Sequence, residues 1–129
     1  DVCSSDLACK NKERMTDEVR AGYLAPYNNY ANRIGTLRFV QDIPMSSDAL
    51  SYSVVKNIEE NLEQFKSLPV MIAWGAKDFV FNDHFLKKWQ GIFPEAEVHR
   101  VQDAGHYVLE DSYERIIPWI QEFLQKNPL

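Results

Sequence analysis

The pattern of apolar and polar residues changes near residue 68 and divides the chain into two regions. Residues 10–67 have the pattern of helices and loops, and residues 68–129 have the order strand, helix, strand, helix. This order predicts an α/β fold, and specifically the C-terminal part of a doubly wound, mostly parallel sheet preceded by a helical region.

Two helices are expected at the start of the first region. Thr16, followed by two acidic residues, can begin the first helix, and Pro26 interrupts it. A second helix is expected over residues 27–40, and Pro44 ends it.

The third helix is predicted to carry one apolar face. Ser46 or Ser47 can cap its start, with Asp48 in the first turn. Apolar residues then recur at three- and four-residue spacing, so this stripe is expected to face a core. The stripe consists of Leu50, Val54, Ile58, Leu62 and Phe65.

The second region contains two predicted strands. Residues 69–74 form a continuous apolar run, which suits a strand buried on both faces of a parallel sheet, and residues 97–101 form a second short strand. Asn82 or Asp83 can cap the helix between them. The side chains expected to point inward from that helix are Phe85, Leu86 and Trp89.

The last helix is expected from about Glu110 to Gln125. Pro118 lies inside it and removes a backbone hydrogen bond, so a kink or a helix start is expected just before this residue. The expected buried face consists of Ile116, Ile117, Ile120, Phe123 and Leu124.

Two features indicate that the chain is part of a longer protein. A parallel pair of strands needs neighbouring strands and helices on both faces, so further strands are expected upstream. The first seven residues, DVCSSDL, match one reading frame of a common sequencing-library adapter. Residues 1–7 are therefore expected to be a non-native tail and are excluded from the fold prediction.

Two polar residues follow the two predicted strands. Asp78 lies in WGAKD after the first strand, and His106 lies in DAGHYV after the second, 28 residues later. Active sites of open α/β sheets lie beyond the carboxyl ends of the strands, so both side chains are expected at one edge. Singly, such an Asp suits a turn or a cap and such a His suits a structural role. Together they favour a catalytic pair in which the carboxylate orients an imidazole that acts as general base.

The sequence around this pair resembles the last third of α/β-hydrolases. The segments that carry the resemblance are PVMIAWGAKD, FPEAEVH, DAGHYVLED and a final IxxFL. The branch that it resembles most is that of haloalkane dehalogenases and epoxide hydrolases, and YLAPY and FVQDIP further upstream also look like that branch. The chain is similar too to the β-lactone decarboxylases of long-chain olefin biosynthesis, which place the acid after this strand.

The resemblance implies a division of the chain and roles for its residues. Residues 8–50 correspond to the end of a helical cap region, and residues 51–129 to the C-terminal part of the hydrolase core. Asp78 matches the triad acid and His106 the triad base. The nucleophile of this branch is an Asp that forms an ester intermediate, which water activated by the histidine then hydrolyses. The resemblance places it upstream of residue 10, and no G-x-S-x-G or G-x-D-x-G occurs in this chain.

Four apolar or aromatic residues near the pair are predicted to contact the substrate. They could line an apolar pocket, and ordinary hydrophobic packing is the alternative interpretation. The four are Phe79, Phe81, Tyr107 and Val108.

The remaining acidic and imidazole side chains suit structural roles. Asp83 can cap a helix, and Glu110 and Asp111 fit the first turn of the last helix, where negative charge is favourable. His84 and His99 have no cysteine or carboxylate partners at ligand spacing, so no metal site is expected.

Composition narrows the possible partners. A net charge of −5 without a Lys/Arg run argues against nucleic acid and against an anionic membrane surface. No apolar stretch approaches the roughly 18–20 residues that span a bilayer. Two cysteines near one end form no disulfide framework, so a cytoplasmic protein is expected.

The resulting prediction is a cofactor-free hydrolase, similar to haloalkane dehalogenases, that acts on a small hydrophobic substrate. The chain would supply the acid and the base and would be inactive by itself. The alternatives are a β-lactone decarboxylase, an epoxide or ester hydrolase of the same fold, a ligand-binding member without catalysis, and a small interaction domain.

Overall fold

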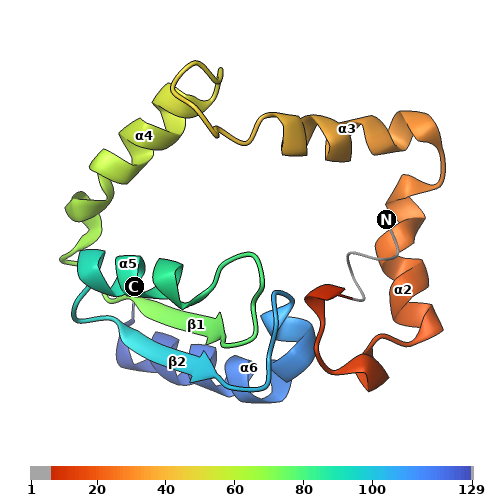
Figure 1. Cartoon of the computed structure of the whole chain (residues 1–129). Coiled ribbons are helices and arrows are strands. Elements are labelled where there is room, and N and C mark those ends of the chain that lie inside the picture. Colours follow the sequence, from red (N-terminus) through yellow and green to blue (C-terminus); the bar gives the residue numbers. More distant parts are fainter. Residues whose placement is uncertain (1–6, 129) are drawn as a thin grey trace.

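The structure is a computed structural model of the chain and describes residues 7–128 (Figure 1). The predicted adapter-derived tail, apart from Leu7, lies outside the described residues. No helix between Leu7 and Pro128 is both long enough and apolar enough to cross a membrane.

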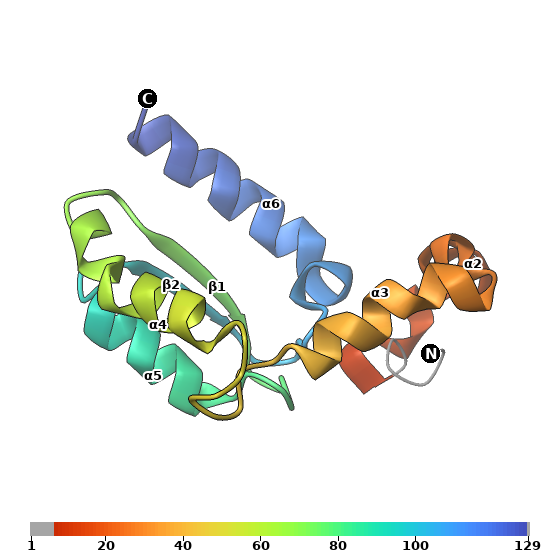
Figure 2. The same ribbon diagram turned by 90° about the horizontal axis from the view of Figure 1, so that it is seen from above.

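The predicted strands form a two-stranded parallel sheet. Strand β1 (Met71–Gly75) pairs with β2 (Glu97–Val101) in a register that matches first residue with first and last with last. Helix α5 (Asp83–Ile92) connects the strands, and α6 (Val108–Lys126) follows β2. Figures 1 and 2 show these two helices on opposite faces of the sheet. This arrangement confirms the predicted α/β order and brings the carboxyl ends of both strands to one edge.

Short helices precede the sheet. Thr16 caps helix α2 (Asp17–Leu24), since its hydroxyl accepts a hydrogen bond from the N–H of Val19 at 3.3 Å. The predicted helix start at Thr16 is thus confirmed. Pro26 lies in a 3₁₀ turn that separates two α-helices, as predicted. The second of them begins a few residues later than expected, because Asn29 caps it through the N–H of Asn32. The elements are η1 (Lys12–Arg14), α2 (Asp17–Leu24), η2 (Ala25–Tyr27), α3 (Tyr30–Gln41), α4 (Tyr52–Glu60) and η3 (Leu62–Phe65).

The predicted start of the third helix is wrong. Helix α4 begins at Tyr52 and not after Ser46 or Ser47, because the intervening residues form turns, with the N–H of Ala49 bonded to the carbonyl of Ser46 at 3.1 Å. Of the predicted apolar stripe, Val54 and Ile58 lie in α4, while Leu50 precedes the helix and Leu62 and Phe65 lie in η3. No member of the stripe is buried. Leu50 is 94% exposed, and other residues of the stripe are exposed as well. The helical period therefore identifies a common face, while the described part of the chain provides nothing that covers it.

The last helix, α6, differs from its prediction in two ways. The last helix bends at Ser112, which has φ −155° and ψ 32°, and not at Pro118 as predicted. Ile116 is buried, but Ile117, Ile120 and Leu124 on the predicted face are exposed.

The buried side chains lie near the sheet and the start of the chain. The buried apolar residues are Ala8, Cys9, Met15, Leu86, Phe93, Val101, Ala104 and Ile116.

The cap of α5 is Asn82, one of the two predicted candidates, and the capping role predicted for Asp83 is wrong. The Asn82 side chain accepts a hydrogen bond from the N–H of His84 at 2.9 Å. The Asp83 carboxylate instead pairs with the guanidinium of Arg100 on β2, at 2.7 and 2.9 Å, and this contact lowers the pKa of Asp83. Asp83 thus ties α5 to the neighbouring strand and lies outside the site described next.

Candidate active site

Asp78 and His106 lie in hydrogen-bond contact at the carboxyl edge of the sheet. The Nδ1 atom of His106 is 3.0 Å from Oδ2 and 3.2 Å from Oδ1 of Asp78. The Asp78 side chain is 10% exposed and the His106 side chain 31% exposed. Because a carboxylate accepts hydrogen bonds, this contact favours the tautomer of the neutral ring with the proton on Nδ1, in which Nε2 carries the free lone pair. The ring can therefore accept a proton from a group placed beyond Nε2.

The Asp78 carboxylate is oriented by its own loop. Its Oδ1 accepts hydrogen bonds from the N–H groups of Val80 at 2.8 Å and Phe81 at 2.9 Å. The N–H of Asp78 in turn donates to the carbonyl of Gly75 at 3.1 Å. This turn is common for Asp after a glycine, and it leaves Oδ2 directed to His106.

The loops that carry Asp78 and His106 touch each other at Gly75. The N–H of Lys77 donates to the carbonyl of Ala104 at 2.8 Å. A Cβ atom on Gly75 would lie 2.1 Å from the carbonyl oxygen of Gly105 and 2.9 Å from that of Ala104. Real Cβ atoms do not approach backbone oxygens so closely, so only glycine allows this contact. The sequence indicated Gly75 only as the end of a strand and gave no sign of this role.

Three of the four predicted substrate-binding residues surround the imidazole. Ring centroids of Phe81, Tyr107 and Phe79 lie 5.6, 6.0 and 6.3 Å from that of His106. Phe79 is 57% exposed and Phe81 45% exposed, so both present apolar surface beside the histidine. Val108, the fourth, begins α6 next to Tyr107.

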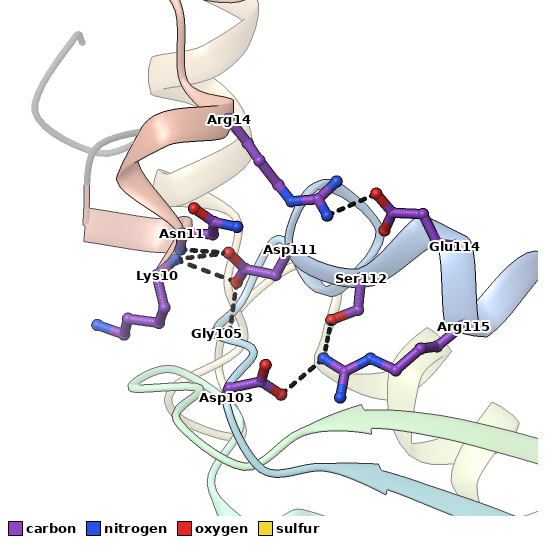
Figure 3. Close-up of polar contacts among 9 residues, drawn as sticks. All are labelled: Lys10, Asn11, Arg14, Asp103, Gly105, Asp111, Ser112, Glu114 and Arg115. Carbon is purple, nitrogen blue, oxygen red and sulfur yellow. Dashed lines mark hydrogen bonds and ion pairs between the residues drawn. The ribbon is translucent and has the colours of Figure 1, made fainter.

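Asp111 has a role that the sequence did not reveal. Asp111 is buried, with 6% of its surface exposed. Its carboxylate accepts hydrogen bonds from the N–H of Asn11 at 2.7 Å, of Lys10 at 2.8 Å and of Gly105 at 2.6 Å. Figure 3 shows the carboxylate between these backbone segments. Burial alone would raise its pKa, but the hydrogen bonds from Asn11, Cys9, Gly105 and Lys10 outweigh burial and hold the pKa of Asp111 below its usual value. The residue is therefore a carboxylate at neutral pH, in addition to lying in the first turn of α6 as predicted.

Tyr23 of α2 also reaches this region. Its hydroxyl donates to Oε1 of Glu110 at 2.7 Å, and its ring stacks on Tyr107 with centroids 5.3 Å apart. Burial and this hydrogen bond raise the pKa of Tyr23 to about 12. The sequence did not predict the contact, because the two partners are 87 residues apart.

Cys9 is expected to react slowly with alkylating reagents. Its buried thiol donates to Asp111 Oδ1 at 3.0 Å, and burial together with this bond raises the pKa of Cys9 to about 11. The thiolate is the reactive form, so a pKa about two units above the ordinary thiol value lowers reactivity by roughly 100-fold. In a Cys3→Ser variant, mass spectrometry should show iodoacetamide alkylation at pH 8 to be slower by this factor than in guanidinium. Equal rates in both conditions would contradict the described environment of Cys9.

The other two histidines lie apart from the pair. His99 stacks on Trp119, with centroids 4.2 Å apart, and faces Glu97, while His84 packs edge-on against Phe85. Among residues 7–128, no three side chains of His, Cys, Asp or Glu are grouped closely enough to hold a metal ion.

Comparison with known proteins places these features in a family context. A model of the alpha/beta hydrolase fold family matches residues 10–113. A cis-3-alkyl-4-alkyloxetan-2-one decarboxylase of Shewanella oneidensis is 45% identical over 116 residues, which are 90% of this chain and 36% of that protein. The protein of the same name from Xanthomonas campestris pv. campestris is 46% identical over 116 residues, which are 39% of its length. The chain thus spans less than two fifths of the curated relatives that it matches.

Proposed function

Because the chain belongs to the alpha/beta hydrolase fold family, we propose that Asp78 and His106 are the acid and the base of a catalytic site. The observation that carries the proposal is the 3.0 Å contact between them at the carboxyl ends of two adjacent parallel strands. In this fold the acid precedes the histidine along the chain, as it does here. Asp78 holds the Nδ1 proton and stabilises the imidazolium, so Nε2 can accept a proton from a reacting group and return it within the same turnover.

We further propose that the reaction is the decarboxylation of a dialkyl β-lactone. Two relatives at 45% and 46% identity carry the name of that activity, which favours it over the haloalkane dehalogenase reaction placed first on sequence grounds. Loss of carbon dioxide from a four-membered lactone with alkyl groups on carbons 3 and 4 leaves an alkene. The exposed rings of Phe79 and Phe81, with Tyr107 and Val108, supply apolar surface for such alkyl groups.

The nucleophile is proposed to come from the part of the relatives' length that this chain does not match. Neither nucleophile motif named above occurs in the 129 residues. By itself the chain is therefore expected to be inactive. A cofactor-free reaction and a cytoplasmic location stay predictions.

A chimera tests the proposed reaction. In the Shewanella oneidensis relative, the 116 matched residues are replaced by those of this chain. The chimera should convert a cis-3,4-dialkyloxetan-2-one into the alkene and carbon dioxide, measured by gas chromatography, and should release no halide from a bromoalkane. Halide release without alkene would favour the dehalogenase. A folded chimera that binds the lactone without turnover would favour the ligand-binding alternative.

A further inference from the structure

We propose that Asp111 is a positioning residue for His106, because its carboxylate ties the histidine loop to residues 8–11 and thereby holds the imidazole against Asp78. The inference rests on the catalytic role proposed for the pair and adds a residue outside it. Asp111 does not touch the reacting atoms, so it acts through the backbone on either side of His106.

On one side, the carboxylate holds the segment near the start of the chain. Oδ1 accepts from the N–H of Asn11 at 2.7 Å and from the Cys9 thiol at 3.0 Å. The N–H of Lys10 lies 2.8 Å from Oδ1 and 3.1 Å from Oδ2. Consecutive backbone donors thus converge on one buried acceptor, which fixes the path of this segment.

On the other side, the same carboxylate holds the histidine loop. Oδ2 accepts from the N–H of Gly105, the residue before His106, at 2.6 Å. The N–H of Tyr107, the residue after His106, donates to the carbonyl of Ala8 at 3.1 Å. Asp111 therefore holds the backbone before the histidine directly, and the segment that it fixes holds the backbone after the histidine. The fit is close, since a Cβ atom on Gly105 would lie 2.5 Å from the carbonyl oxygen of Ala8.

Only a carboxylate satisfies this arrangement. All four groups around Asp111 are donors, and an ionised carboxylate offers acceptor positions on both oxygens. An amide at this place would direct its own N–H₂ group toward N–H donors and leave buried donors unpaired, which is costly. The neighbouring ion pairs Arg14–Glu114 and Arg115–Asp103, also drawn in Figure 3, are more exposed and do not bond to Gly105.

The test measures the tautomer of His106. In the 129-residue chain labelled with ¹⁵N-histidine, long-range ¹H–¹⁵N spectra should show the Nδ1–H tautomer at neutral pH, because the hydrogen bond to Asp78 sets it. The signal is assigned by its loss in His106→Gln. Asp111→Asn is expected to abolish the preference for Nδ1–H while the dispersed backbone spectrum persists. Glu114→Gln removes the ion pair with Arg14, which follows residues 8–11 along the chain, without touching the histidine loop, and should leave the tautomer unchanged.

A purely structural role predicts a different result. In that case Asp111→Asn would lower the melting temperature while the tautomer of the folded form stayed as in the parent chain, and this outcome would overturn the proposal. If Asp111→Asn does not fold, Asp111→Glu decides: its extra methylene cannot keep all contacts of 2.6–3.1 Å. A reduced Nδ1–H fraction in folded Asp111→Glu supports the proposal, and an unchanged one overturns it. Since this readout needs neither nucleophile nor substrate, its result is independent of whether the chimera has decarboxylase activity.

Discussion

Replacement of His106 by alanine in the chimera is expected to lower kcat for the lactone by on the order of 10²–10⁴-fold, which is what a positioned general base contributes. The expectation follows from the geometry of the pair. Asp78 holds Nδ1 at 3.0 Å, so Nε2 is the atom that can take a proton from a reacting group and return it within the same turnover, and alanine removes that atom. KM should change little, because the aromatic rings around the histidine remain to bind the alkyl groups.

His84→Ala provides the matched control for this change. His84 is exposed, lies in α5 and packs against Phe85, and it makes no contact with Asp78 or with His106 that the structure describes. Steady-state kinetics should show parental kcat for this variant. Retention of full activity by His106→Ala would remove the catalytic interpretation of the pair, whatever the reaction turns out to be.

Some features with local signals in the sequence were predicted correctly. Strand β2 has the predicted bounds, and Thr16 caps a helix as its acidic neighbours indicated. The contact between Asp78 and His106 was also within reach of the sequence. Each residue follows a strand, and parallel neighbouring strands place their carboxyl ends at one edge. The strand and cap follow from neighbouring residues, and the contact follows from strand order, which the sequence also shows.

Features that depend on distant parts of the chain were not predictable. The donors to Asp111 include backbone groups about a hundred residues away, and nothing in the local pattern distinguished Asp111 from Glu110 beside it. The stripe of α4 illustrates the same limit, because spacing identifies which side chains share a face but not what packs on it. Val54 and Ile58 share a face of α4 and are nevertheless 59% and 56% exposed.

The substitution Gly75→Ala is expected to damage both stability and the site. The new methyl carbon would lie 2.1 Å from the carbonyl oxygen of Gly105, a backbone atom that cannot move without moving the His106 loop. Overpacking of this kind should lower the free energy of unfolding of the chain by about 3 kcal/mol. A displacement of His106 by about 1 Å should lower kcat of the chimera by roughly 10²-fold.

Gly91→Ala is the control that separates this steric effect from the general effect of replacing glycine. A Cβ atom on Gly91 in α5 meets nothing within 4 Å, so alanine there should raise the free energy of unfolding by about 0.5–1 kcal/mol through helix propensity. Guanidinium unfolding of both variants, with kinetics of the corresponding chimeras, measures the contrast. If the two alanines behaved alike, the loops of Asp78 and His106 would not be in contact at Gly75. The close approach that places the acid beside the base would then have to arise elsewhere in the fold.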